Sequence, residues 1–120
     1  MVYGLTHKFR LESARFLSKL PPGHPCRNMH GHSFLITLSL RASALDPSLD
    51  WLIDFNEVAT AVRPVLARLD HKVLNEVPGL ENPTSENLCI YLLKELRPVL
   101  PMLWKVSISE TVDTECSVEI

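Results

Sequence analysis

Hydrophobic and polar residues alternate along four stretches of the chain and recur at helical spacing along two others. The alternating stretches, which have the period of two typical of half-buried β-strands, are residues 6–16, 33–41, 106–112 and 116–120. Between the second and third of them, apolar residues recur every three or four positions from Asp54 to Leu69 and again from Thr84 to Leu96, as on one face of an α-helix. The predicted order of elements is therefore ββααββ.

The two predicted helices have recognisable beginnings. Asp54, followed three residues later by Glu57, forms a capping-box arrangement, and Thr84 can cap the second helix through its hydroxyl. Pro64 lies inside the first helical pattern, where it removes one backbone donor. We therefore expect the first helix to be bent or divided at Pro64.

This order of elements predicts an α+β fold. Two strands, two helices and two further strands cannot alternate as βαβ units, so we expect a four-stranded antiparallel sheet with both helices on one face. A chain of 120 residues has room for one core, which predicts a single domain over residues 1–120. The open edges of such a sheet must be covered, charged or paired with another chain, and pairing would produce a homo-oligomer.

Composition and charge exclude several classes of protein. Hydrophobic residues make up 46% of the chain and charged residues 22%, as in a packed globular protein rather than a disordered one. The formal net charge of -2 provides no excess of positive charge for nonspecific binding to nucleic acid. No apolar run is long enough for a membrane helix and no signal peptide is recognisable, so we expect a cytoplasmic protein. Three widely spaced cysteines without a CxxC pair argue against a disulfide framework.

Two histidines and a cysteine stand close together in the sequence. His30 and His32 flank Gly31, and in an extended chain this spacing points both imidazoles to the same face, where they can bind one ion. The alternative is a pair of partly buried histidines that form hydrogen bonds with their neighbours. Cys26 lies four residues before His30 in a loop rich in proline, where it is either a thiolate base or nucleophile or an inert thiol.

Two further positions carry ionisable side chains in unusual places. Asp70 precedes His71 at the end of the first predicted helix, and a carboxylate beside an imidazole can hold a general base in one tautomer; the alternative is a solvated pair. Glu110 shares a strand face with Val106 and Ile108, so its carboxylate needs a partner on the apolar side. That partner is either the guanidine-like edge of a pterin or guanine or an internal arginine.

Six segments resemble a known family in their order and spacing. They are PGHPC (22–26), HGHSF (30–34), WLIDF (51–55), LDH (69–71), PGLENPTSEN (78–87) and ET (110–111). Together they resemble the 6-pyruvoyltetrahydropterin synthase and 6-carboxytetrahydropterin synthase family, most closely the bacterial 6-carboxytetrahydropterin synthases of queuosine biosynthesis. The likeness spans nearly the whole chain.

The resemblance implies a fold, an assembly and a reaction. The fold is the tunnelling fold, in which subunits join their sheets into a trimeric barrel and two trimers stack into a hexamer. The substrate is 7,8-dihydroneopterin triphosphate, and the product is 6-carboxy-5,6,7,8-tetrahydropterin, with loss of acetaldehyde and triphosphate. Elimination of triphosphate to a 6-pyruvoyl product is one alternative, and a diverged pterin-binding paralogue without catalysis is another.

The resemblance also implies roles for individual residues and for a zinc ion, Zn2+. These roles are proton abstraction by Cys26, proton transfer by His71 with Asp70 orienting it, pterin binding by Glu110, and zinc binding by His30 and His32. A zinc ion in that position would polarise the substrate hydroxyls and stabilise the charge that develops when a thiolate removes a proton.

The chain departs from the family pattern at one position. The family's first zinc-binding histidine ends a Glu-Ala-Ala-His sequence on the opening strand, and the corresponding residues here are Glu12-Ser13-Ala14-Arg15. A guanidinium group stays protonated and has no acceptor, so Arg15 cannot bind zinc.

Three hypotheses accommodate Arg15. In the first, His30 and His32 hold zinc with water, and Arg15 turns outward to bind the substrate triphosphate. In the second, His24 supplies the missing ligand, since His7 lies about 26 Å along the strand at about 3.3 Å per residue. In the third, the metal is lost and Arg15 supplies the positive charge.

Overall fold

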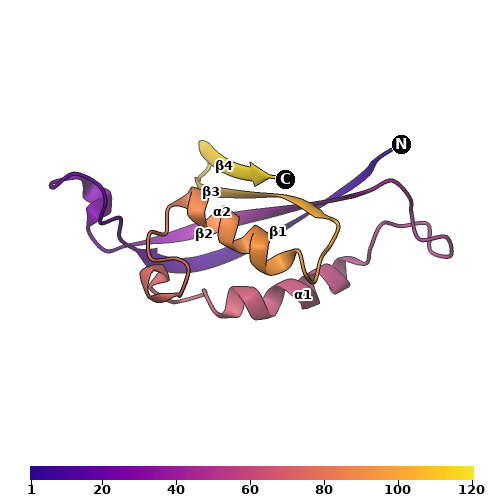
Figure 1. Ribbon diagram of the computed structural model, residues 1–120, viewed down its shortest axis with the longest axis horizontal. Helices are drawn as coiled ribbons and strands as arrows, with labels where there is room; N and C mark the ends of the chain where they lie inside the picture. The colour runs from indigo at the N-terminus through magenta and orange to yellow at the C-terminus, as the bar shows by residue number, and fades with distance from the viewer.

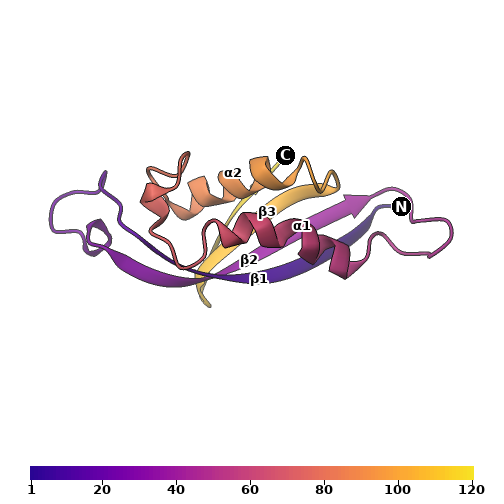
Figure 2. The same cartoon turned by 90° about the horizontal axis from the view of Figure 1, so that it is seen from below.

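Four strands form one antiparallel sheet in the order β1-β2-β3-β4 in the computed structural model, which describes residues 1–120 (Figure 1). The strands are β1 (Tyr3–Arg15), β2 (His30–Ala42), β3 (Leu103–Thr111) and β4 (Thr114–Glu119). Helices α1 (Phe55–Ala67) and α2 (Ser85–Leu96) lie side by side on one face of the sheet (Figure 2). The predicted α+β fold and the ββααββ order are confirmed.

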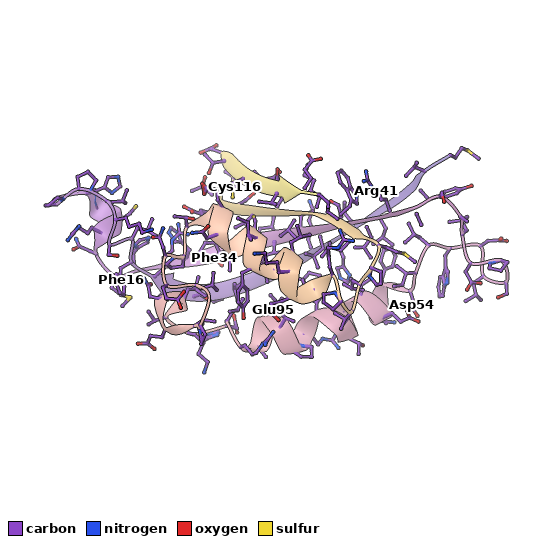
Figure 3. All side chains as sticks on the ribbon, viewed as in Figure 1. Phe16, Phe34, Arg41, Asp54, Glu95 and Cys116 are labelled. Atoms are coloured by element: carbon purple, nitrogen blue, oxygen red, sulfur yellow. The ribbon has the colours of Figure 1, made fainter.

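The core lies between this face of the sheet and the two helices, because alternate residues of the strands point toward the helices. In β2 these residues are fully or almost fully buried, and Phe34 lies beneath the N-terminal end of α2 (Figure 3). The strand residues of the core are Leu11, Phe34, Ile36, Leu38, Leu40, Leu103, Val106 and Ile108, and the helical ones are Val58, Val62, Val65, Leu88, Cys89, Leu92 and Leu96. Their burial supplies the main free energy that holds the sheet and helices together.

Both helices begin where the sequence predicts. The Asp54 carboxylate accepts a hydrogen bond from the Asn56 N–H at 2.8 Å, and the Thr84 hydroxyl accepts one from the Asn87 N–H at 3.1 Å. Of the two expectations for Pro64, a bend or a division of the first helix, the division is wrong, because α1 continues from Phe55 to Ala67 with Pro64 inside it. Pro64 lies on the exposed side of α1, where water can solvate the carbonyl that lacks a donor.

Two loops extend the molecule beyond the ends of the sheet, which gives it dimensions of 57 × 25 × 22 Å (Figure 1). Residues 16–29 form the loop at one end and include a short 3₁₀ turn, Pro25–Arg27. Residues 43–54 form the loop at the other end. The predicted loop around Cys26 is therefore confirmed, and it adjoins the ends of β1 and β2 that carry Arg15 and His30.

One edge of the sheet is partly covered by the segment that follows α1. The backbone N–H of Ala14 donates to the Lys72 carbonyl at 2.9 Å, and the His71 N–H donates to the Glu12 carbonyl at 2.6 Å. Val73 extends this contact as a parallel bridge to Ala14. The segment therefore fixes Asp70 and His71 against β1. Neither α1 nor α2 has the length and apolar character of a membrane-crossing helix.

Candidate active site

The helix-facing side of the sheet changes from apolar to polar near the loop of residues 16–29. Arg15 pairs with His30 across β1 and β2, and their side chains continue the faces that carry Leu11 and Phe34. Glu110 lies two residues beyond the buried Ile108 on β3, on the same face. A polar cluster thus replaces the core at this end of the sheet. We call it the strand-end cluster, and it comprises Arg15, His30, His32, Ser85 and Glu110.

The Arg15 side chain is held within this cluster by three neighbours. Its guanidinium donates to the carbonyl of Pro83 at 3.1 Å, to the hydroxyl of Ser85 at 3.2 Å and to Oε1 of Glu110. The Ser85 hydroxyl donates to the same Glu110 oxygen. Arg15 is only 2% exposed, and a buried guanidinium of this kind requires such partners. The structure therefore shows the internal arginine that the sequence left open as a partner for Glu110.

His30 and His32 lie beside the ion pair. Their ring centroids are 4.8 Å apart and their planes are perpendicular. Nδ1 of His30 lies 2.7 Å from the Asn28 carbonyl, so it donates a hydrogen bond and leaves Nε2 as an acceptor. The Nε2 atoms of both histidines are buried and have no hydrogen-bond partner. The spacing correctly predicts a shared face, and both rings keep a free nitrogen.

Electrostatic interactions set the charges of Glu110 and His32. Burial opposes ionisation of Glu110, but hydrogen bonds from Ser85 and Arg15 and the charge of Arg15 outweigh it and lower the pKa of Glu110. Burial and the charge of Arg15 lower the pKa of His32, while Glu110 opposes this shift. His32 Nε2 lies 3.9 Å from Glu110 Oε2, beyond hydrogen-bond distance. The cluster thus combines one carboxylate, one guanidinium and a neutral His32.

The residues of the cluster do not fit a zinc ion with three protein ligands. Two imidazole nitrogens are available, but nowhere in the chain do three His, Cys, Asp or Glu side chains gather closely enough to hold a metal ion. His24 does not supply the third ligand, because its Nδ1 accepts the Cys26 N–H at 3.1 Å within the exposed loop. His7 stacks on Phe9 outside the cluster.

Asp70 and His71 form a carboxylate–imidazole pair at the edge of β1. One carboxylate oxygen lies 2.7 Å from His71 Nδ1, and the other accepts the Glu12 N–H at 3.0 Å. The Glu12 hydrogen bond, followed by that of His71, lowers the pKa of Asp70. His71 has a φ of 57°, in the left-handed region, and its side chain is 78% exposed. Asp70 therefore orients His71 and leaves its second nitrogen accessible.

A cleft of about 480 Å³ lies between His71 and His32 of the strand-end cluster. Gly31, His32 and Ser33 of β2 line it together with His71 and Lys72. His71 of the pair and His32 of the cluster therefore line the same cleft, although they lie about forty positions apart in the sequence. This proximity could not be read from the spacing of the residues, because it depends on the backbone contacts that place the segment after α1 against β1.

Cys26 lies in the 3₁₀ turn of the loop beyond the sheet. It is half-buried, its backbone carbonyl accepts the Leu17 N–H at 2.9 Å, and its thiol forms no hydrogen bond. No hydrogen bond or ion pair connects Cys26 with the strand-end cluster. The structure thus gathers Arg15, His30, His32 and Glu110, places Asp70 and His71 on the adjoining edge, and leaves Cys26 on the loop.

Sequence analysis missed the contribution of Ser85. This residue is the first of α2, directly after the cap Thr84, and its hydroxyl contacts both Arg15 and Glu110. The only signal in the sequence was its place within the PGLENPTSEN segment. The contact itself depends on the packing of α2 against β3.

Comparisons with known proteins extend over almost the whole chain. The family model for 6-pyruvoyl tetrahydropterin synthase matches residues 4–120. The 6-carboxy-5,6,7,8-tetrahydropterin synthase of Synechocystis is 32% identical over 111 residues, which cover 87% of this chain and 83% of the relative. A putative 6-carboxy-5,6,7,8-tetrahydropterin synthase of Archaeoglobus fulgidus is 32% identical over 93 residues, or 77% of each chain. The solved structure of Caenorhabditis elegans 6-pyruvoyl tetrahydropterin synthase has a TM-score of 0.90 at 25% identity and covers 100% of this chain and 96% of that one.

Proposed function

Because the chain belongs to the 6-pyruvoyl tetrahydropterin synthase family and has its tunnelling fold, we propose that it is a lyase that acts on the side chain of a pterin triphosphate. The proposed reaction converts 7,8-dihydroneopterin triphosphate and one molecule of water to 6-carboxy-5,6,7,8-tetrahydropterin, acetaldehyde and triphosphate. Two relatives named for the 6-carboxy product support this choice over the 6-pyruvoyl product. The corresponding pathway is queuosine biosynthesis.

The observation that carries the proposal is the Asp70–His71 pair, whose histidine lines the cleft. A general acid or base must keep one tautomer and present its free nitrogen to the substrate. Asp70 holds Nδ1 of His71, and the exposed Nε2 can exchange a proton with a hydroxyl of the substrate side chain. In this proposal Cys26 is the base that removes the carbon-bound proton, and the loop that carries it contacts the bound substrate.

Glu110 is proposed to bind the pterin ring. Its Oε1 is taken by Arg15 and Ser85, which orient the carboxylate, and its Oε2 has no hydrogen-bond partner. An N–H of the 2-amino-4-oxo edge of a pterin can donate to Oε2 in a charge-assisted hydrogen bond. Zinc dependence does not follow from the residues present, because no three His, Cys, Asp or Glu side chains gather into a metal site.

The experiment that tests the proposal is incubation of the purified chain with 7,8-dihydroneopterin triphosphate. We expect acetaldehyde and 6-carboxy-5,6,7,8-tetrahydropterin, identified by mass spectrometry, and no turnover by Cys26→Ala. Pterin binding by Cys26→Ala should be retained, as measured by fluorescence titration, because Glu110 is intact. A 6-pyruvoyl product would identify the alternative reaction, and the absence of any product would overturn the proposed lyase activity.

The Arg15 position favours a second candidate, a pterin-binding protein without catalysis. Arg15 stands where the resemblance places a zinc ligand, and it already occupies one oxygen of the proposed pterin-binding carboxylate. Pterin binding without product in the same incubation would identify this function. The Glu110→Gln variant should then bind pterin more weakly, since the charge on the acceptor is lost.

A further inference from the structure

The Arg15 side chain is enclosed by segments that are distant in the sequence. Pro83 precedes α2, Ser85 begins it, and Glu110 lies on β3, and each provides an acceptor for the guanidinium. The Phe34 ring lies beneath, with its centroid 5.2 Å from the guanidinium carbon. The positive charge therefore has a fixed position inside the molecule.

This position excludes the first hypothesis for Arg15 in the structure as it stands. A guanidinium that binds a substrate triphosphate must present its donors to the solvent-filled cleft. Arg15 is 2% exposed, and both of its terminal nitrogens already donate to groups of the protein. The guanidinium is paired with Glu110, and its terminal nitrogens do not donate to a ligand in the cleft.

The position of Arg15 also explains why His30 and His32 lack a third zinc ligand. Arg15 faces His30 across the two strands, at the β1 position where the family resemblance places the third histidine ligand. A histidine there would provide a neutral nitrogen, whereas arginine provides a permanent positive charge and no lone pair. A catalytic zinc ion normally has three protein ligands, and a neighbouring cation further opposes its binding.

We infer that the guanidinium of Arg15 has replaced the metal ion as the positive charge of this site, so that the chain binds no stoichiometric zinc. Glu110 and Ser85 hold this internal cation in place. The Nε2 atoms of His30 and His32 are buried and have no hydrogen-bond partner, and on this inference they hold no metal ion. The inference concerns metal binding alone, so it stands or falls independently of the proposed lyase activity.

Metal titration of the wild-type chain and of Arg15→His tests the inference. Zinc content after equilibration and dialysis is measured by mass spectrometry, and Co2+ is titrated separately because its visible absorption reports tetrahedral coordination. We expect the wild type to retain no stoichiometric zinc and to show no tetrahedral cobalt spectrum. Arg15→His should bind about one zinc ion per chain, with an affinity increased about 100-fold or more.

Two control variants show whether zinc binding requires a histidine at position 15 itself and loss of the positive charge there. Arg10→His adds a histidine to the same strand on the exposed, opposite face, and should bind no more zinc than the wild type. Arg15→Lys keeps a positive charge and should also remain metal-free, and circular dichroism reports whether each variant is folded. Stoichiometric, tight zinc in the wild type would overturn the inference. A folded Arg15→His that gains no zinc would also overturn the inference, because replacing the guanidinium with a histidine would then not restore metal binding.

Discussion

At the scale of single residues, Arg15 and Glu110 stabilise each other as a partly buried ion pair. Glu110→Ala leaves a guanidinium that is 2% exposed with only neutral partners, and we expect it to lower the free energy of unfolding by about 3 kcal/mol. Arg15→Leu should cost less, because the Glu110 side chain is 30% exposed and water can solvate it. The double variant Arg15→Leu/Glu110→Leu should lose less free energy of unfolding than the two single variants lose in sum. Urea denaturation followed by circular dichroism measures all three.

The exposed pair of Arg68 and Glu95 is a matched control for this cycle. Its nitrogen and oxygen atoms are 3.2 Å apart, but the side chains are 53% and 40% exposed. The corresponding coupling should therefore lie within about 0.5 kcal/mol of zero. Equal coupling energies for the two pairs would contradict the claim that burial makes the Arg15–Glu110 pair important.

Asp70 gives the stability of the chain a dependence on pH. Hydrogen bonds from the Glu12 N–H and from His71 hold the pKa of Asp70 below its ordinary value of 3.8. A carboxyl whose pKa is lower in the folded state adds stability above its unfolded pKa, and this contribution is lost as pH falls through the folded pKa. We expect wild type to be more stable than Asp70→Asn at pH 7, and the difference to shrink below pH 4.

Urea midpoints of both proteins between pH 3 and pH 7 measure this difference. Asp46, Glu81 and Glu110 also have a lowered pKa, but they are present in both proteins and cancel in the comparison. A difference that stays constant over the whole range would show that ionisation of Asp70 does not contribute to stability.

The candidate site could be predicted from the sequence only where its contacts are local. Strand periodicity fixes the shared face of His30 and His32, and adjacency in the chain made the Asp70–His71 contact a reasonable hypothesis. The partner of Glu110 could not be identified from the sequence. The alternation of residues along a strand shows which face a side chain is on, but not which side chain from a distant segment lies opposite it. The contacts among Arg15, Ser85 and Glu110 arise from the packing of α2 onto the sheet.

At the scale of elements, the period-two pattern of the strands and the helix caps correctly predicted the type and order of the strands and helices. The residues at which the strands begin and end were less well predicted. β1 begins at Tyr3 rather than Thr6, and β2 begins at His30 rather than Ser33. The reason is the register, since Tyr3 pairs with Ala42 and Arg15 with His30. A strand continues for as long as its partner supplies hydrogen bonds, and this information lies in the partner rather than in the local pattern.

Pro64 is an unfavourable residue within α1, and replacing it should stabilise the protein. It has no N–H to donate to the carbonyl one turn earlier in the helix, and its side chain is exposed, so no packing is lost when it is removed. Pro64→Ala should raise the free energy of unfolding by about 1 to 2 kcal/mol, after allowance for the greater freedom of the unfolded chain. Arg63→Ala, also exposed in α1, should change it by less than about 0.5 kcal/mol. Thermal and urea denaturation check both, and a destabilised Pro64→Ala would contradict the prediction.

At the scale of the whole molecule, the sheet ends in two edges that differ in their protection. The segment after α1 covers the second half of β1, whereas β4 has no neighbour on its outer side. Ile120 donates its N–H to the Trp104 carbonyl at 3.0 Å, so residues of even number in β4 bond to β3. The N–H of Ser117 therefore points to the open edge, where a strand of another copy can accept it.

Assembly through this edge can be tested by removing a single backbone N–H, that of Ser117. We expect the wild-type chain to have a mass three or six times its 13.6 kDa in light scattering or analytical ultracentrifugation, as edge pairing into a trimer or hexamer requires. Ser117→Pro removes the outward N–H without removing a hydrogen bond to β3, so it should shift the mass toward that of one chain. Ser117→Ala keeps the N–H and should assemble like the wild type, and circular dichroism checks that both variants fold. A single-chain mass for the wild type, or an unchanged mass for folded Ser117→Pro, would show that the β4 edge does not join copies of the chain.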